Sequence, residues 1–145
     1  MLTATTPFDL PIAVRPEDID QFGHVNNVVY VRWVQEAAIA HWSALANAEE
    51  QARLTWVILR HEIDYKRAAF LKDAIVARTW VGPADGLSFE RNTEILRIAD
   101  RKLLARARTL WCPVEARTLR PVEPGNDVRA RFSSNGPAIF SADVF

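Results

Sequence analysis

The sequence predicts an α+β protein in which a five-stranded antiparallel sheet wraps around one long central helix. Two observations support this prediction. One long apolar segment follows the N-terminal region with its polar residues at helical spacing, and most of the later chain has strand character. A helix and a sheet of this kind bury their apolar faces against each other. The expected elements are a strand at 12–15, a helix at 28–46 and strands at 55–65, 74–81, 88–98 and 102–114.

The expected helix is rich in Val, Ala, Ile and Trp. Its polar side chains, Arg32, Gln35, Glu36 and Ser43, fall near one stripe at helical spacing. A stripe this narrow predicts that the helix is largely buried. At about 1.5 Å per residue the helix is about 28 Å long.

The strands after the helix alternate between apolar and charged residues. In the first of them, the apolar residues expected on the covered face are Val57, Leu59, Ile63 and Tyr65. The Gly-Pro-Ala-Asp-Gly segment at 82–86 is typical of a turn and is expected to join the next two strands. A sheet packed on one helix leaves its outer face partly apolar, so we expect a homodimer or a homotetramer.

Composition limits the function classes. The 145 residues suit one domain, in which 125–145 is a tail with no assigned role, and 18 Lys plus Arg balance 18 Asp plus Glu. This balance disfavours nucleic acid and anionic membranes as partners. The lone cysteine, Cys112, excludes an internal disulfide, and neither a signal peptide nor a bilayer-spanning run is evident, so a cytoplasmic location is expected.

Residues 18–30 gather the groups most suited to chemistry. Carboxylates, a glycine, a histidine and two asparagines directly precede the expected helix. The first N–H groups of a helix lack intrahelical acceptors and lie at its positive end, so they stabilise a developing oxyanion. Asn26 or Asn27 is a suitable N-cap. This arrangement predicts an active site in which a loop carboxylate lies near the start of a helix.

This segment also resembles a known family. The matching positions are Asp20, Gly23, His24, Val25, Asn26, Asn27, Tyr30, Trp33 and Glu36. They resemble the signature of hotdog-fold acyl-CoA thioesterases of the 4-hydroxybenzoyl-CoA thioesterase type, and the portion from His24 to Trp33 is also similar to plant acyl-carrier-protein thioesterases. Residues 64–73 more weakly resemble the family segment between the second and third strands. The resemblance implies a hotdog fold and hydrolysis of an acyl-CoA thioester to the carboxylic acid and CoA. It implies no cofactor other than the coenzyme A of the substrate, and acyl-carrier protein is the alternative carrier.

The resemblance assigns catalytic roles within the motif. Asp20 matches the family acid, which either attacks the thioester to give a mixed anhydride or activates a water molecule. The backbone N–H of Asn27 matches the oxyanion donor. Gly23 permits a positive φ or a close approach of the substrate. His24 is expected to bind the substrate carbonyl or to set the charge state of Asp20, although Phe22 replaces an asparagine of the plant enzymes.

Other residues are weaker candidates for substrate contacts. Tyr30 and Trp33 are expected to shape the acyl pocket or the core, and Glu36 either joins the site or pairs with Arg32 four residues earlier. Cations suited to the phosphates of CoA are Lys66, Arg67 and Arg91, together with Lys102, Arg106 and Arg108 on one strand. His41 and His61 lack the spacing of a zinc site, so no metal is expected.

Two alternative functions remain open from the sequence. A hotdog dehydratase or hydratase acting on 3-hydroxyacyl thioesters would use His24 with Glu36, but it gives Asp20 no task. A non-catalytic acyl-thioester binding module would hold the carbonyl at the helix start without delivering water. The presence of Asp20 argues against both alternatives.

Overall fold

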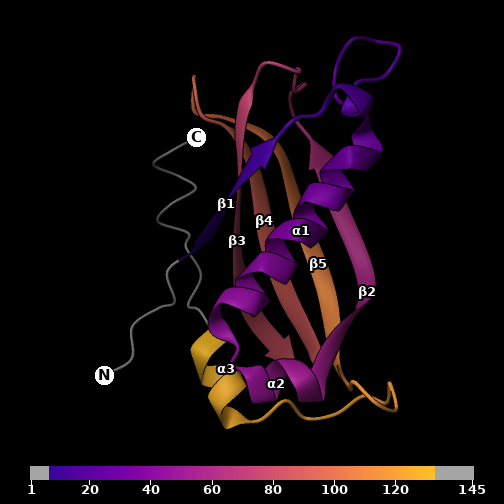
Figure 1. Cartoon of the computed structure of the whole chain (residues 1–145), viewed down its shortest axis with the longest axis vertical. Coiled ribbons are helices and arrows are strands. Elements are labelled where there is room, and N and C mark those ends of the chain that lie inside the picture. Colours follow the sequence, from indigo (N-terminus) through magenta and orange to yellow (C-terminus); the bar gives the residue numbers. More distant parts are fainter. Residues whose placement is uncertain (1–6, 133–145) are drawn as a thin grey trace.

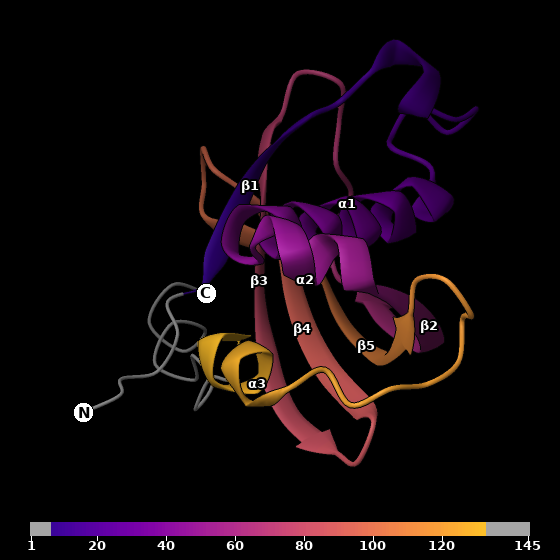
Figure 2. The same cartoon turned by 60° about the horizontal axis from the view of Figure 1, so that its bottom comes forward.

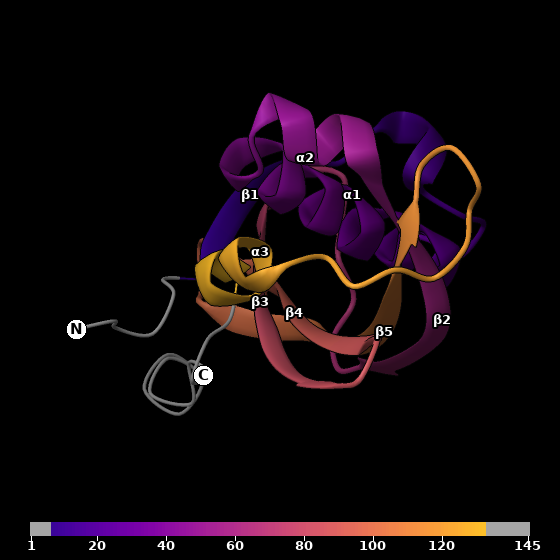
Figure 3. The same ribbon diagram turned by 90° about the horizontal axis from the view of Figure 1, so that it is seen from below.

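The computed structural model describes residues 7–132 and confirms the α+β architecture (Figure 1). One antiparallel sheet has the strand order β1-β3-β4-β5-β2, and helix α1 lies across its inner face. Figures 2 and 3 show the sheet curving around this helix. The elements are β1 Phe8–Ala13, a 3-10 turn Pro16–Asp18, α1 Asn27–Leu45, α2 Ala48–Arg53, β2 Leu54–Tyr65, β3 Ala74–Asp85, β4 Ser88–Arg97, β5 Lys102–Glu115 and α3 Asn126–Phe132.

Helix α1 begins one residue before its expected start because Asn26 caps it. The Asn26 Oδ1 accepts a hydrogen bond from the Val28 N–H at 2.9 Å. The buried face of α1 packs on the inner face of the sheet, where Ile75 and Ile95 are fully buried. The opposite face includes Val28 and Ile39, which are 68% and 53% exposed. The sequence pattern predicted that all of the helix except a narrow stripe is buried. In the structure only one face of the helix is buried.

Strand β2 differs from the expected alternation because it contains a bulge. The pairing of β2 with β5 shifts between Ile58 and Arg60, so Leu59 has no partner. The shift moves the inward-facing positions from even to odd numbers. Val57 and Leu59, expected on the covered face, are 44% and 57% exposed, whereas Ile63 packs against the core.

The expected turn at 82–86 is shorter in the structure. Strand β3 continues to Asp85, and the turn contains only Gly86 and Leu87, with Gly86 at φ +61°. The Gly82–Pro83 pair lies in a register shift between Val81 and Ala84. Proline fits there because β1 pairs with β3 only as far as Thr79, which leaves this end of β3 at a sheet edge.

Two short helices were not expected from the sequence. Helix α2 has a capping box in which Asn47 and Glu50 bond each other's backbone N–H groups at 2.8 and 3.0 Å. Helix α3 begins inside the segment 125–145 that the sequence left unassigned. The rest of that segment, 133–145, lies outside the described residues.

The outer face of the sheet carries cross-strand ion pairs rather than an apolar surface. Arg78 on β3 pairs with Asp9 on β1 at 2.9 Å, and Arg106 on β5 pairs with Glu94 on β4 at 3.0 Å. Arg108 pairs with Glu90 at 2.8 Å. Exposed apolar side chains lie instead on α1, on connecting segments and on strand β2, which forms one edge of the sheet.

Candidate active site

The segment from Asp18 to Asn26 folds into a small hairpin that leads directly into α1. The Asn26 N–H donates to the Asp18 carbonyl at 2.9 Å, and the Asp20 N–H donates to the His24 carbonyl at 3.0 Å. The Gly23 N–H closes the turn on the Asp20 carbonyl at 3.0 Å. Gly23 has φ +84°, the positive value expected for it, so an L side chain at this position would strain the turn.

The Asp20 carboxylate lies at the turn of this hairpin. Its side chain is 12% exposed, and its Oδ1 accepts the Phe22 N–H at 2.9 Å. The same oxygen lies 3.9 Å from His24 Nδ1. Within residues 7–132 the second oxygen, Oδ2, makes no hydrogen bond, so it is available to a reactant.

One ring nitrogen of His24 contacts a backbone carbonyl, and the other has no hydrogen-bond partner among residues 7–132. Its Nδ1 lies 3.2 Å from the Val25 carbonyl. Because a carbonyl only accepts, Nδ1 is the protonated nitrogen. In the neutral ring Nε2 is then an acceptor, on a side chain that is 39% exposed. His24 is thus placed beside Asp20 with a nitrogen that can exchange a proton.

Asp18, two residues before Asp20, is part of the framework. Its side chain is 1% exposed and accepts two hydrogen bonds from Arg32 at 3.0 and 3.1 Å and one from the Arg15 N–H at 2.9 Å. Burial acts to raise the pKa of Asp18, but the hydrogen bonds from Arg32 and Arg15 outweigh it and lower the pKa. Arg32 also lies 3.5 Å from Glu36, so Glu36 forms the i,i+4 ion pair considered from the sequence.

The connection after β2 packs beside the hairpin and the start of α1. The Tyr30 hydroxyl accepts the Ala69 N–H at 3.0 Å and donates to the Arg67 carbonyl at 3.4 Å. The Val25 N–H donates to the Ala69 carbonyl at 2.8 Å. The Tyr65 hydroxyl donates to the Asn27 carbonyl at 2.9 Å. These bonds hold the hairpin and the helix start in one position relative to the 65–69 segment.

The remaining candidates lie in three different places. Lys66 and Arg67 are exposed and lie on the segment beside the hairpin. Trp33 is fully buried in the core and packs on Tyr30, with ring centroids 5.1 Å apart. Arg91 is 8% exposed and lies in a cavity at the opposite end of α1, away from Lys66 and Arg67.

This cavity has a volume of about 460 Å³ and lies between the C-terminal half of α1, strands β2 to β5 and helix α3. Its walls include Trp42, Trp56, Phe89, Trp111 and Phe132. The sequence did not point to Phe89, Trp111 or Phe132 as cavity residues. Strand alternation would have placed Phe89 on the same face as Arg91, but the contribution of α3 had no signal in the sequence.

Comparison with protein families matches residues 14–132 to the model of the thioesterase-like superfamily. The chain belongs to the thioesterase-like superfamily. Membership confirms the expected enzyme class, thioester hydrolase. A comparison with curated proteins finds no match.

Several solved structures, thioesterases among them, have the same fold as this superfamily member. One is Slr0204, a 1,4-dihydroxy-2-naphthoyl-CoA thioesterase from Synechocystis, with a TM-score of 0.72 and 20% identity over 86% of this chain and 95% of that one. A thioesterase from Thermus thermophilus, complexed with coenzyme A and Zn, has a TM-score of 0.72 and 22% identity over 86% of this chain and 90% of that one. The PA5185 protein of Pseudomonas aeruginosa has a TM-score of 0.78 and 21% identity over 90% of this chain and 98% of that one. At these identities the likeness establishes the fold, and the expected hotdog architecture is confirmed.

Residues 7–132 hold no group of three or more His, Cys, Asp or Glu side chains placed to bind a metal ion. In the same residues, no helix has both the length and the apolar character needed to cross a bilayer.

Proposed function

We propose that this member of the superfamily hydrolyses acyl-CoA thioesters to the carboxylic acid and CoA, with Asp20 as the catalytic carboxylate. The observation that supports this most directly is the hairpin, which leads directly into α1 and leaves one oxygen of Asp20 without a hydrogen bond among the described residues. Two structural neighbours also favour CoA as the carrier, one being a 1,4-dihydroxy-2-naphthoyl-CoA thioesterase and the other a complex with coenzyme A.

Two routes are compatible with this geometry. In the first, Asp20 Oδ2 attacks the thioester carbonyl carbon, the C–S bond breaks, CoA leaves as the thiolate, and water hydrolyses the mixed anhydride. In the second, Asp20 removes a proton from a water molecule that attacks the carbonyl carbon directly. In both routes the N–H of Asn27, which has no intrahelical acceptor, stabilises the negative carbonyl oxygen.

Two other features of the site fit this proposal. His24 adjoins Asp20 and supplies a proton to the leaving thiolate or polarises the carbonyl. Lys66 and Arg67 are exposed beside the hairpin, where they can meet the phosphates of CoA. Tyr30 serves the site by positioning the segment that carries Arg67.

The alternative of a dehydratase receives no support from the geometry. Its two candidate groups, His24 and Glu36, are far apart, because Glu36 lies about 13 Å along α1 from Asn27 at 1.5 Å per residue. Glu36 is also engaged with Arg32 at 3.5 Å. The binding-module alternative predicts that the parent protein binds acyl-CoA but releases no thiol.

The test is release of free thiol from short, long and aromatic acyl-CoAs. We expect Asp20→Asn to lower kcat/KM at least about a hundredfold, the scale for loss of a central catalytic group. Glu17→Gln, an exposed neighbour, is the matched control and should keep full activity. Equal rates for the parent and Asp20→Asn would exclude Asp20 as the catalytic carboxylate. Silence of the parent across the panel would move the proposal to a carrier-protein substrate.

We also propose that the protein is a homodimer that pairs along the open edge of β2. Strand β2 bonds only to β5, and Val57, Leu59 and Tyr65 on it are 44%, 57% and 45% exposed. An open edge with apolar side chains is suited to pairing with another strand. We expect light scattering to give a dimer for the parent and a monomer for Val57→Lys combined with Leu59→Lys. Ile98→Lys, at an exposed position whose N–H bonds Ala74 at the start of β3, is the control, and a dimer in the double variant would contradict this interface.

A further inference from the structure

The cavity at the C-terminal end of α1 contains a cation that nothing in the described chain neutralises. Arg91 is 8% exposed, and its Nη1 donates to His41 Nδ1 and to Thr79 Oγ1, both at 3.0 Å. Both acceptors are neutral: a guanidinium only donates, so His41 Nδ1 carries no proton. No Asp or Glu within residues 7–132 pairs with Arg91, and its Nε and Nη2 have no hydrogen-bond partner there.

The other charged residues of the cavity wall are already paired. Glu90 accepts from Arg108 at 2.8 Å and from Asn92 at 3.1 Å. Arg129 forms two hydrogen bonds with Glu123 at 2.6 and 2.8 Å. The excess charge of the cavity therefore belongs to Arg91. Burial of an unpaired ion costs several kcal/mol, a cost that a protein seldom retains without a use.

The wall around Arg91 offers further donors and few acceptors. The indole Nε1 atoms of Trp56 and Trp111 are buried and have no hydrogen-bond partner among the described residues. The aromatic rings are fixed by each other, because Trp56 packs edge-on against Trp42 and Phe89 with centroids 5.5 and 5.2 Å apart. A preformed aromatic wall with unpaired donors and one cation is suited to a flat or apolar body that bears a negative group.

We propose that this cavity is a binding site for an organic carboxylate, with the carboxylate on Arg91 and the apolar or aromatic body against Trp42, Trp56 and Trp111. The guanidinium fork matches a carboxylate with two parallel hydrogen bonds. The volume of about 460 Å³ suits a small organic molecule. Burial lowers the pKa of Arg91 to about 10, which leaves the group charged at neutral pH.

This site is separate from Asp20 within one chain. Along α1, the cavity residues Ala38 and Trp42 lie about 16–23 Å from Asn27 at 1.5 Å per residue. The carboxylate has two possible sources. It is either part of the acyl group, when another copy of the chain brings its Asp20 hairpin to this cavity, or a separate small acid.

The experiment measures binding of 2-naphthoate and of the neutral 2-naphthamide by calorimetry, together with the indole N–H signals in ¹H–¹⁵N spectra. We expect the parent to bind the carboxylate at least tenfold more tightly than the amide, with shifts of the Trp56 and Trp111 signals. Arg91→Gln should reduce naphthoate affinity at least tenfold, and Arg91→Lys should restore part of it. Arg60→Gln, an exposed arginine paired with Glu62, is the control and should bind as the parent does.

A second variant keeps the test valid if Arg91→Gln does not fold. Ala38→Leu keeps Arg91 and adds a larger side chain to the cavity wall, so it should also weaken naphthoate binding. Equal binding of carboxylate and amide by the parent, absence of binding at millimolar naphthoate, or unchanged affinity in a folded Arg91→Gln would overturn the proposal.

The source of the carboxylate is found by adding naphthoate to the thioesterase assay. Competitive inhibition supports the acyl group as the source, and binding without an effect on KM supports a separate acid. Binding itself is measured by calorimetry without turnover, so it does not depend on whether the protein hydrolyses acyl-CoA. Failure of the proposed hydrolysis is therefore distinguishable from failure of this site.

Discussion

Asp18 and Asp20 are neighbours in the sequence, yet their surroundings give them different tasks. Asp18 is 1% exposed and bonds Arg32 with both oxygens, whereas Asp20 keeps one oxygen free beside His24. A group whose hydrogen bonds are all used internally holds the framework. A group with an unused oxygen at the surface can act on a substrate.

The two aspartates should therefore separate stability from activity. Asp18→Asn loses a charge-assisted contact with Arg32, and we expect unfolding to become easier by about 1.5–3 kcal/mol. Asp20→Asn keeps an acceptor for the Phe22 N–H, so its stability should change by less than about 1 kcal/mol while activity collapses. Urea denaturation measures the first effect and thiol release the second. An Asp18→Asn variant as stable as the parent would show that the contact between Asp18 and Arg32 does not contribute to stability.

At the residue scale, the motif could be predicted from sequence but its geometry only in part. The order of cap, glycine and acid along 20–27 follows from local chain chemistry, and Gly23 has the expected positive φ. The sequence did not decide whether Asn26 or Asn27 caps the helix, because that depends on the residue at which the helical backbone begins. The pairing of Asp18 with Arg32 spans fourteen residues, and that of Arg91 with His41 spans fifty, so neither contact had a local signal.

At the element scale, one bulge explains the main error in the predicted sheet. The boundaries of β2, β4 and β5 were close to those expected, because alternation and turn residues are local features. The first strand was misplaced, since it was expected at 12–15 and is Phe8–Ala13. The sequence did not predict correctly which residues of β2 face inward, because the extra Leu59 reverses the alternation halfway along the strand. The bulge also leaves Leu59 at the edge where dimer pairing is proposed.

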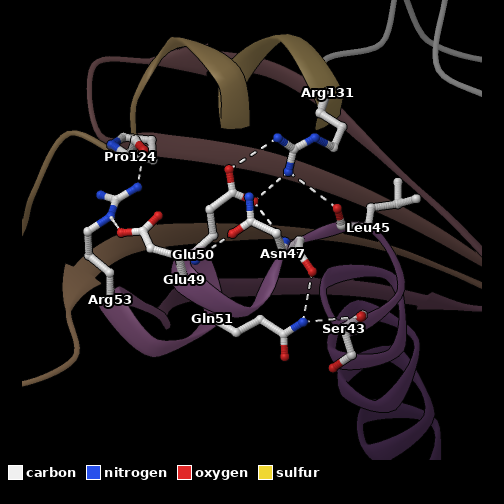
Figure 4. Close-up of polar contacts among 10 residues, drawn as sticks. Ser43, Leu45, Asn47, Glu49, Glu50, Gln51, Arg53, Pro124 and Arg131 are labelled. Carbon is white, nitrogen blue, oxygen red and sulfur yellow. Dashed lines mark hydrogen bonds and ion pairs between the residues drawn. The ribbon is translucent and has the colours of Figure 1, made fainter.

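Helix α3 is held over the cavity by polar contacts with α2 and the end of α1, as Figure 4 shows. Arg131 on α3 donates to both oxygens of Glu50, with Nη2–Oε2 at 3.1 Å, and to the Leu45 carbonyl at 3.3 Å. Arg53 on α2 donates to the Pro124 carbonyl at 3.2 Å, just before α3. Because α3 contributes Phe132 to the wall, these contacts help to hold that part of the cavity wall in place.

We expect Arg131→Gln to loosen α3 without disturbing the sheet. Hydrogen exchange of the amides in 126–132 should become at least tenfold faster, since local opening depends on the few contacts that hold a short helix. Amides of β4 and β5 should exchange as before. Arg117→Gln, at an exposed position, is the control. Unchanged exchange in α3 would show that its apolar contacts alone hold it.

At the scale of the whole molecule, α1 connects two regions of different character, which lie at its opposite ends in Figure 1. The hairpin with Asp20 adjoins its N-terminal end, and the cavity with Arg91 lies beside its C-terminal half. Each region draws on several elements. Local sequence patterns therefore predicted the first region, whose key residues are contiguous, and missed the second, whose walls come from α1, four strands and α3.

The second region should also make stability depend on pH. His41 is 1% exposed beside Arg91, and burial together with the charge of Arg91 lowers its pKa to about 3. In the unfolded chain the pKa is about 6.5. Between these values the unfolded chain binds a proton that the folded chain does not, so stability is lost as the pH falls from about 6.5.

The expected size of the effect is up to about 1.4 kcal/mol per pH unit, or about 2 kcal/mol by pH 5. We predict that Tm falls between pH 7.5 and pH 5 and that His41→Gln, whose amide oxygen can still accept from Arg91, flattens most of this fall. Burial also lowers the pKa of His61, so His61→Gln should remove a smaller part. A fall in Tm of the same size in parent and His41→Gln would show that His41 is protonated in the folded protein. Arg91 would then face a second cation, and the cavity would attract an anion more strongly as the pH falls.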